Sequence, residues 1–170
     1  MDSAFNEQII KKQPDVKSLL LKLLIVAGAA VLIFVALVML AGYLLGMNLL
    51  LAAGIGYGAY WLLTSLNIEF EYSIIQDEIY IDKIINRRRR KRLVQTSCRK
   101  FEILAPVAEA YKREFDSQCA GTVDCTSSPS AEGRWFFIFD GKRGRTKVIF
   151  EPTDRMITEF KVYIRPKVKG

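Results

Sequence analysis

The stretch "IEFEYSIIQDEIYIDKIINRRRRKRLVQ", residues 68–95, decides the fold that we predict for this chain. At its start apolar residues alternate with polar ones, the period of a strand with one buried face: Ile68, Phe70, Tyr72 and Ile74. "QDE" then predicts a turn, and "EIYIDKII" predicts a second strand that returns beside the first. A run of six consecutive basic residues follows, and a third strand is expected from about Lys91, within this run, to Cys98. The stretch therefore predicts a small antiparallel sheet.

The residues that follow predict further strands. A short strand is expected over 100–104, a helical turn or an irregular crossing over 105–117, and a loop over 118–133. "RWFFIFDGKRGRTKVIFE", residues 134–151, predicts a second hairpin, because a turn with two glycines separates its two apolar runs.

The segment "PTDRMITEFKVYI" has the chemistry of a helix start. Asp154 is the expected N-cap, and three apolar residues then recur at helical spacing: Ile157, Phe160 and Ile164. A sheet with one apolar face must be covered or must curl. We therefore expect a helix at about 153–164 to cap a bent sheet or partly open barrel, and the fold class to be α+β.

A charge-free stretch between Lys22 and Glu69 predicts a membrane hairpin. It is too long for one span of about 20 residues and long enough for two, and "GYLLGMN" supplies a break. A cleaved signal peptide would have a shorter apolar core, and a helical pair buried in a soluble core would keep a polar face. The predicted parts are an N-terminal segment (1–18), a transmembrane hairpin (19–67, with helices at about 19–41 and 47–66) and a β domain (68–170).

Basic residues on both sides of this hairpin predict its orientation. Lys and Arg concentrate in the cytoplasmic segments next to membrane spans, and the turn between the predicted helices carries no charge. We therefore expect a two-span protein of the cell membrane with both termini in the cytoplasm. The basic residues before the first helix are Lys11, Lys12, Lys17 and Lys22.

The second predicted helix carries small residues at helical spacing: Ala52, Gly54, Gly56 and Gly58. Small residues four apart let helix backbones approach closely. We expect them to pack against the first helix within the hairpin, and a homo-oligomer is the alternative use.

The composition argues against most catalytic chemistry. The chain has no His, which removes Ser-His-Asp and Cys-His nucleophile arrangements and His-containing zinc sites. The three cysteines form no CxxC pair and no metal-ligand spacing, and their role is left open: Cys98, Cys119 and Cys125. No phosphate-binding loop is present, since the turn "DGKRGR" lacks that pattern. We therefore expect no enzyme, no cofactor and no metal.

Two segments carry a resemblance: residues 68–95, quoted above, and "FIFDGKRGRTKVIFEPTDRMITEF", residues 137–160. Their order of strands, basic turn, hairpin and closing helix resembles the pleckstrin-homology-like (PH-like) domain of bacterial membrane proteins, where the domain follows a pair of transmembrane helices. Most of residues 10–165 resembles a family of small two-span bacterial proteins to which no activity is assigned. The resemblance implies a fold and a membrane anchor, and it transfers no functional residues.

The net charge of +7 indicates an anionic partner or a membrane surface. Two predicted strands of similar length lead away from the membrane and back, so the basic turn is expected on the membrane side, where it suits anionic lipid headgroups. A protein partner is a second candidate, and a solvated turn that acts only as a topology signal is the structural alternative. Nucleic acid is a remote alternative, suggested by the arginines and by Trp135, Phe136 and Phe137. The candidate contact residues are Arg87, Arg88, Arg89, Arg90, Lys91, Arg92, Lys142, Arg143 and Arg145.

Overall fold

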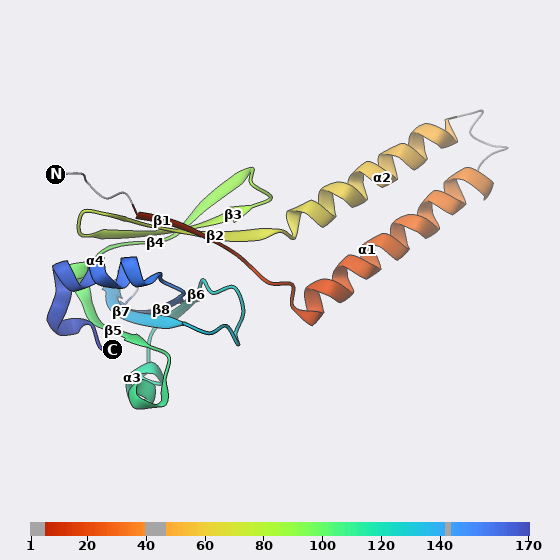
Figure 1. Ribbon diagram of the computed structural model, residues 1–170. Helices are drawn as coiled ribbons and strands as arrows, with labels where there is room; N and C mark the ends of the chain where they lie inside the picture. The colour runs from red at the N-terminus through yellow and green to blue at the C-terminus, as the bar shows by residue number, and fades with distance from the viewer. Residues whose placement is uncertain (1–5, 40–46, 142–143) are drawn as a thin grey trace. The chain divides into compact units, whose positions relative to one another are not determined.

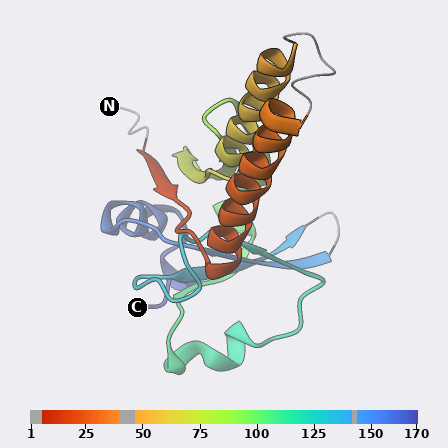
Figure 2. The same ribbon diagram turned by 90° about the vertical axis from the view of Figure 1, so that its right-hand side faces the viewer.

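A computed structural model describes residues 6–39, 47–141 and 144–170. The chain forms two compact units. One is a helical hairpin, Gln13–Ile68, and the other combines the N-terminal residues up to Lys12 with Glu69–Gly170 (Figures 1 and 2). The second unit is thus built from both ends of the chain.

The helical unit consists of α1 (Val16–Phe34), which continues as a π-helical segment, Val35–Met39, and α2 (Asn48–Ser65). The helix α1 begins three residues before the predicted residue 19, because the Asp15 side chain accepts a hydrogen bond from Val16 N at 2.8 Å and caps it. Part of the predicted break lies outside the described residues.

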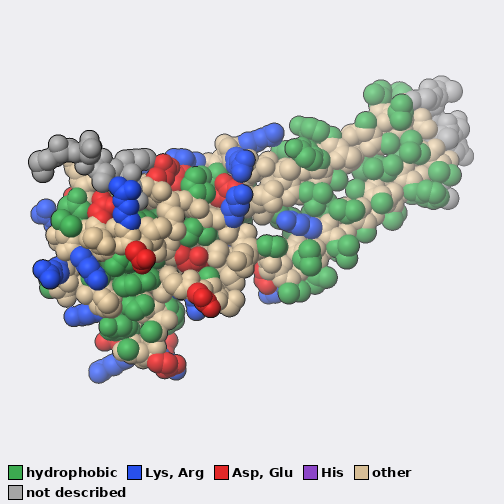
Figure 3. All heavy atoms as spheres, in the orientation of Figure 1, with side chains coloured by type: hydrophobic (Ala, Val, Ile, Leu, Met, Phe, Trp, Pro, Cys, Tyr) green, Lys and Arg blue, Asp and Glu red, His purple; other side chains and the backbone are tan. Residues whose placement is uncertain are grey.

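The two helices contact each other, and most of their side chains face outward. Ala36 and Ala52 are buried, whereas Leu24 is 70% exposed and Leu50 is 72% exposed. Figure 3 shows hydrophobic side chains spread along both helices. Among the described residues, one helix, Val16–Val38, is long and apolar enough to cross a membrane. The helix α2 does not meet that standard, since glycines, aromatic residues and polar ends lower its hydropathy.

The first sheet has the strand order β1-β2-β3-β4. Its strands are β1 (Asn6–Lys11), β2 (Ile68–Ile75), β3 (Glu78–Ile85) and β4 (Arg89–Ser97). The predicted hairpin over 68–85 is present as β2 and β3. The strand β4 begins at Arg89, two residues before the predicted start, so the last four of the six basic residues belong to a strand.

The strand β1 was not predicted. It pairs antiparallel with β2, with Lys11 opposite Glu69 at the end next to the helical unit in sequence. The six residues of β1, NEQIIK, show no alternation of apolar and polar residues, and their partner strand lies beyond both helices. Local sequence therefore does not reveal the pairing, which makes part of the predicted N-terminal segment a component of the β domain.

The second sheet has the strand order β5-β7-β8-β6. Its strands are β5 (Phe101–Pro106), β7 (Trp135–Gly141), β8 (Gly144–Phe150) and β6 (Gly121–Asp124). The hairpin predicted over 134–151 is present as β7 and β8. The prediction of a loop over 118–133 is wrong at β6, which pairs parallel to β8. This short strand has no fully buried residue, so its sequence gives a loop-like pattern, and the sheet is mixed rather than wholly antiparallel.

Aromatic side chains from both sheets and from α4 (Asp154–Ile164) form the main core. The rings of Phe101 and Phe137 stack with centroids 4.2 Å apart, and Tyr72 of the first sheet packs edge-on against Phe150 of the second. The side chain that caps α4 is Thr153, which accepts from Met156 N at 3.3 Å. The prediction of Asp154 as the cap is therefore wrong by one residue, and the helix itself lies where it was predicted.

A second apolar cluster covers the other face of the second sheet. It contains Phe136 and Ile138, with Phe115 packed against it. Phe115 ends the short helix α3 (Lys112–Phe115), which follows a 3-10 turn at Glu109–Tyr111. Because both faces of β7 are covered, Phe136 and Phe137 are fully buried, and neither ring is exposed for stacking on a base.

Candidate anion-binding groove

The basic run begins in the tight turn between β3 and β4. The backbone is left-handed at Asn86 (φ 51°) and at Arg87 (φ 53°), and Arg88 N donates to Ile85 O at 3.1 Å. Two successive left-handed residues are what a type I′ hairpin turn requires. Asn tolerates this conformation, whereas Arg takes it rarely. Gly would fit position 87 with less strain, so the arginine costs stability there.

This turn forms one wall of a groove with a volume of about 580 Å³. The groove lies within the β domain. Basic side chains, a single carboxylate and two isoleucines line it, and they come from β1, from β2 and from the β3–β4 hairpin. Its lining residues are Ile9, Lys11, Glu69, Ile84, Arg87, Arg88, Arg89 and Arg90. Four of the predicted contact residues are thus brought together with two residues of β1.

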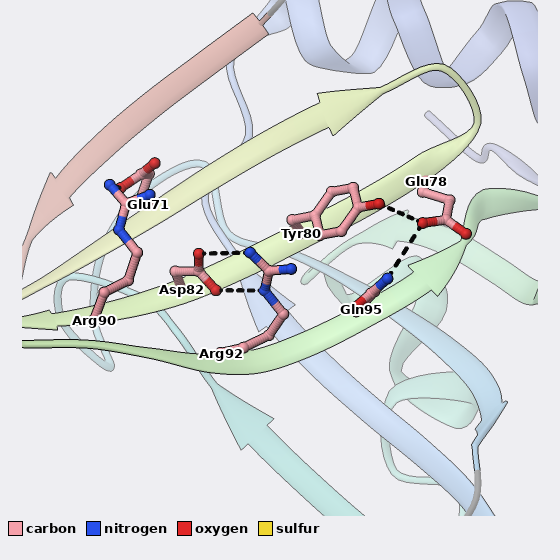
Figure 4. A network of polar contacts seen from close by, with 7 residues as sticks. All are labelled: Glu71, Glu78, Tyr80, Asp82, Arg90, Arg92 and Gln95. Carbon is pink, nitrogen blue, oxygen red and sulfur yellow. Dashed lines mark hydrogen bonds and ion pairs between the residues drawn. The ribbon is translucent and has the colours of Figure 1, made fainter.

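Two arginines of the groove are held by carboxylates of β2. Arg87 Nε lies 3.7 Å from Glu69 Oε1, and the Arg87 side chain remains 77% exposed. Arg90 Nη2 lies 2.5 Å from Glu71 Oε2, without the geometry of a hydrogen bond, and the Glu71 side chain is only 5% exposed (Figure 4). The first contact is loose and solvated, and the second fixes Arg90 against the sheet.

Arg92 belongs to a separate network on the same strand. Its Nε and Nη2 donate to the two carboxylate oxygens of Asp82 at 2.8 and 3.0 Å, and its guanidinium lies 4.7 Å from the centroid of the Tyr80 ring (Figure 4). The bidentate hydrogen bonds with Asp82 raise the pKa of Arg92. The charge of Arg92 is therefore already compensated by Asp82, and Arg92 does not line the groove.

The remaining cations are exposed and available. In the part of the chain that the structure describes, Arg88, Arg89 and Lys11 have no carboxylate within 4.0 Å. Lys91 is likewise exposed and unpaired among the described residues, but it does not line the groove. The groove thus presents three uncompensated cations beside two compensated ones.

Glu71 does not line the groove but pairs with Arg90, which does, and its pKa is unusual for a carboxylate. Burial, a hydrogen bond with Glu7 of β1 and the nearby Asp82 of β3 raise its pKa, while Arg90 of β4 lowers it. The outcome is a rise in the pKa of Glu71 from 4.5 to about 7. Its negative charge, and therefore the compensation of Arg90, changes within the neutral pH range.

Three further contact residues were predicted: Lys142, Arg143 and Arg145. Lys142 and Arg143 lie outside the described residues. Arg145 of β8 pairs with Glu102, with Nη2 2.7 Å from Oε2, and also donates to Gln118 O. Arg145 does not line the groove. Sequence reasoning missed Ile9 and Lys11 as groove residues, because only the pairing of β1 with β2 places them there.

In the second helix, Ala52 is buried. No heavy atom lies within 4 Å of a Cβ placed on Gly54, Gly56 or Gly58. The open space beside these glycines leaves their use in helix packing a prediction.

The three cysteines form no disulfide, and none of them lines the groove. Burial raises the pKa of Cys98 and of Cys125 to about 12, whereas Cys119 is partly exposed. All three thiols are free. Among the residues that the structure describes, no group of three or more His, Cys, Asp and Glu side chains is placed to hold a metal ion.

The fold has two packed sheets, the closing helix α4 and a charged groove. This combination is typical of the PH-like class of domains, and this class suggests an interaction module. The family model described as Bacterial PH-like domain (DUF6106) matches residues 1–170. The chain therefore belongs to this bacterial PH-like family, as the order of its strands and closing helix predicted. No curated protein and no solved structure matches the chain.

Proposed function

We propose that this protein is a non-enzymatic, two-span membrane protein whose PH-like domain binds anionic phospholipid headgroups at the cytoplasmic leaflet. The observation that carries the proposal is the pairing of β1 with β2, with Lys11 opposite Glu69. This register joins both ends of the helical hairpin to the basic groove, because Lys11 and Glu69 both line it.

The pairing supports two spans. The strand β1 precedes α1 and the strand β2 follows α2, yet the two are hydrogen-bonded neighbours in one sheet. If α1 alone crossed a membrane, the two strands would lie on opposite sides of it. A hairpin that enters and returns leaves them on the same side, and the exposed apolar side chains of both helices suit lipid. The same pairing argues against removal of α1 as a signal peptide, since β1 would be lost with it.

The charge distribution supports a cytoplasmic domain. Lys11 and Lys12 precede α1, Lys17 lies in its first turn, and the basic run follows α2, beginning in the turn of the β2–β4 meander. Basic residues near the ends of membrane helices favour the cytoplasmic side. Both termini are therefore assigned to the cytoplasm.

Chain connectivity keeps the groove near the membrane surface. Glu69 is four residues from Ser65, the last residue of α2, and four extended residues span at most about 14 Å. Anionic lipid attracts each nearby Lys or Arg by about 1 kcal/mol, and this attraction falls off within roughly 10 Å. Glu69, at the edge of the groove, is thus tethered within about 14 Å of the end of α2, which favours contact between the groove and headgroups.

The lipid claim is tested by titrating the full chain in neutral detergent micelles with fluorescent phosphatidylglycerol or phosphatidylcholine. We expect preference for phosphatidylglycerol and about 30-fold weaker binding by the double variant Arg88→Gln/Arg89→Gln, which removes two charges that no carboxylate compensates. The matched control is Arg113→Gln/Arg155→Gln, which loses the same charge at exposed positions outside the groove. Equal affinity of wild type and groove variant, or an equal loss in the control, would refute the claim.

The topology claim is tested with a membrane-impermeant thiol reagent. In intact cells Cys119 should be protected until lysis, whereas position 47 in the Met47→Cys variant, next to the helical turn, should react from outside. Labelling of Cys119 in intact cells would contradict the proposed orientation. Protection of position 47 in intact cells would argue that the turn between the helices does not reach the outside.

A further inference from the structure

We infer that the groove is a site for one phospholipid molecule, with the phosphate held by Arg88, Arg89 and Lys11 and the adjoining apolar part of the lipid placed on Ile9 and Ile84. This inference rests on the proposed function and deepens it. Diffuse attraction between a basic turn and a charged surface needs no groove and no apolar lining. The structure has both.

The apolar lining is the first observation. Ile9 is 55% exposed although it lies in the middle of β1, opposite Glu71. Ile84 of β3 is 9% exposed and lines the same groove. An exposed isoleucine among charged side chains buries little surface in the free protein, and a ligand with an apolar part would cover it.

The arrangement of charge is the second observation. Glu69 and Glu71 hold Arg87 and Arg90, so the uncompensated charge is concentrated on Arg88, Arg89 and Lys11. Arginine binds phosphate oxygens through several donors at once. Lys11 comes from β1, Arg88 from the β3–β4 turn and Arg89 from the first residue of β4, so separate elements border the groove.

The size of the groove is the third observation. A volume of about 580 Å³ falls within the range of about 300–1,000 Å³ that is usual for small-molecule sites. A free phosphate would leave most of this space and the isoleucines unused. An anion that carries an apolar portion matches both the charge and the lining, and a phospholipid is such an anion.

The test displaces fluorescent phosphatidylglycerol from the full chain in neutral micelles with unlabelled phosphatidylglycerol, glycerol phosphate or inorganic phosphate. The central variant is Ile9→Gln, which changes no charge. We expect it to bind phosphatidylglycerol about fivefold more weakly, because the apolar contact is lost, and to bind glycerol phosphate as the wild type does. Arg88→Gln/Arg89→Gln should weaken both ligands.

The matched control is Ile75→Gln, an isoleucine that is 46% exposed on β2 and does not line the groove. It should bind as the wild type does. Protection of Cys98 and Cys125 from thiol reagents verifies that each variant is folded, and Ile9→Thr, which keeps a β-branched side chain, replaces any variant that fails. Unchanged phosphatidylglycerol affinity in the Ile9 variant would overturn the inference, as would equal affinity for glycerol phosphate and the lipid. A different result would refute the proposed function itself: wild-type affinity for phosphatidylglycerol in the variant Arg88→Gln/Arg89→Gln.

Discussion

Replacement of Arg87 by glycine should raise stability and lower lipid affinity together. The left-handed backbone at position 87 (φ 53°) costs a non-glycine residue roughly 1–2 kcal/mol. Glycine removes this strain, while its greater freedom in the unfolded chain costs about 0.5–1 kcal/mol. The ion pair with Glu69, at 3.7 Å and 77% exposed on the arginine side, contributes at most about 0.5 kcal/mol. The variant should therefore be more stable by about 0–1 kcal/mol.

The effect on binding has the opposite sign. One basic charge near an anionic surface contributes about 1 kcal/mol, so Arg87→Gly should bind phosphatidylglycerol about fivefold more weakly than the wild type. A mutation that merely damaged the fold would lower both quantities. Opposite changes in the two quantities indicate that Arg87 is kept for its charge despite the strain.

Stability is measured on the full chain in neutral micelles as the temperature at which Cys98 and Cys125 become reactive to a thiol reagent, since both thiols are buried in the β domain. We expect this temperature to rise by about 0–5 °C. The control is Gln76→Gly in the β2–β3 turn, where φ is 57°. It should bring the same gain with unchanged binding. Destabilisation by more than about 1 kcal/mol, or full lipid affinity in Arg87→Gly, would refute the reasoning.

Three further predictions concern the β domain. Because the folded state holds the proton of Glu71 more tightly than the unfolded chain, the contribution of Glu71 to wild-type stability should fall as pH rises from 4.5 to about 7 and then level off. Glu71→Gln removes this loss, so it should be more stable than wild type by about 1–3 kcal/mol near pH 8 and by little near pH 5; the same difference at both pH values would contradict the assignment. Under native conditions only Cys119 should react rapidly with maleimide, since Cys98 and Cys125 are buried, and rapid labelling of all three would show that the core is open. Tyr72→Phe leaves Cys125 O without the hydrogen bond that Tyr72 Oη donates at 2.6 Å, so it should cost about 1–3 kcal/mol in thermal unfolding, while Tyr80→Phe at the surface should cost less.

The local patterns of the sequence predicted the hairpins and the closing helix well. The alternation in residues 68–85 and the run in 134–151 each specify a strand pair through neighbours in sequence. Burial on both faces explains why "WFFIF" reads as a continuous apolar run. The strands β1 and β6 were not predicted, because each is short and pairs with a strand that is distant in the sequence.

The candidate site was predictable only in part. The arginines of the turn stand out in the sequence, and four of them line the groove. The register between strands, which no local pattern reveals, decides which cations are compensated: it places Asp82 opposite Arg92 and brings Glu71 to Arg90. The apolar lining depends on Ile9, which reaches the groove through β1 alone.

The most direct test of the central claim is amide hydrogen exchange of residues 85–92 in the full chain, compared between phosphatidylcholine nanodiscs and nanodiscs that also contain phosphatidylglycerol. If the groove binds anionic headgroups, exchange in this turn should slow in the anionic nanodiscs. The slowing should disappear in Arg88→Gln/Arg89→Gln and persist in Arg113→Gln/Arg155→Gln. Equal exchange of the wild-type turn in both nanodiscs would contradict the account.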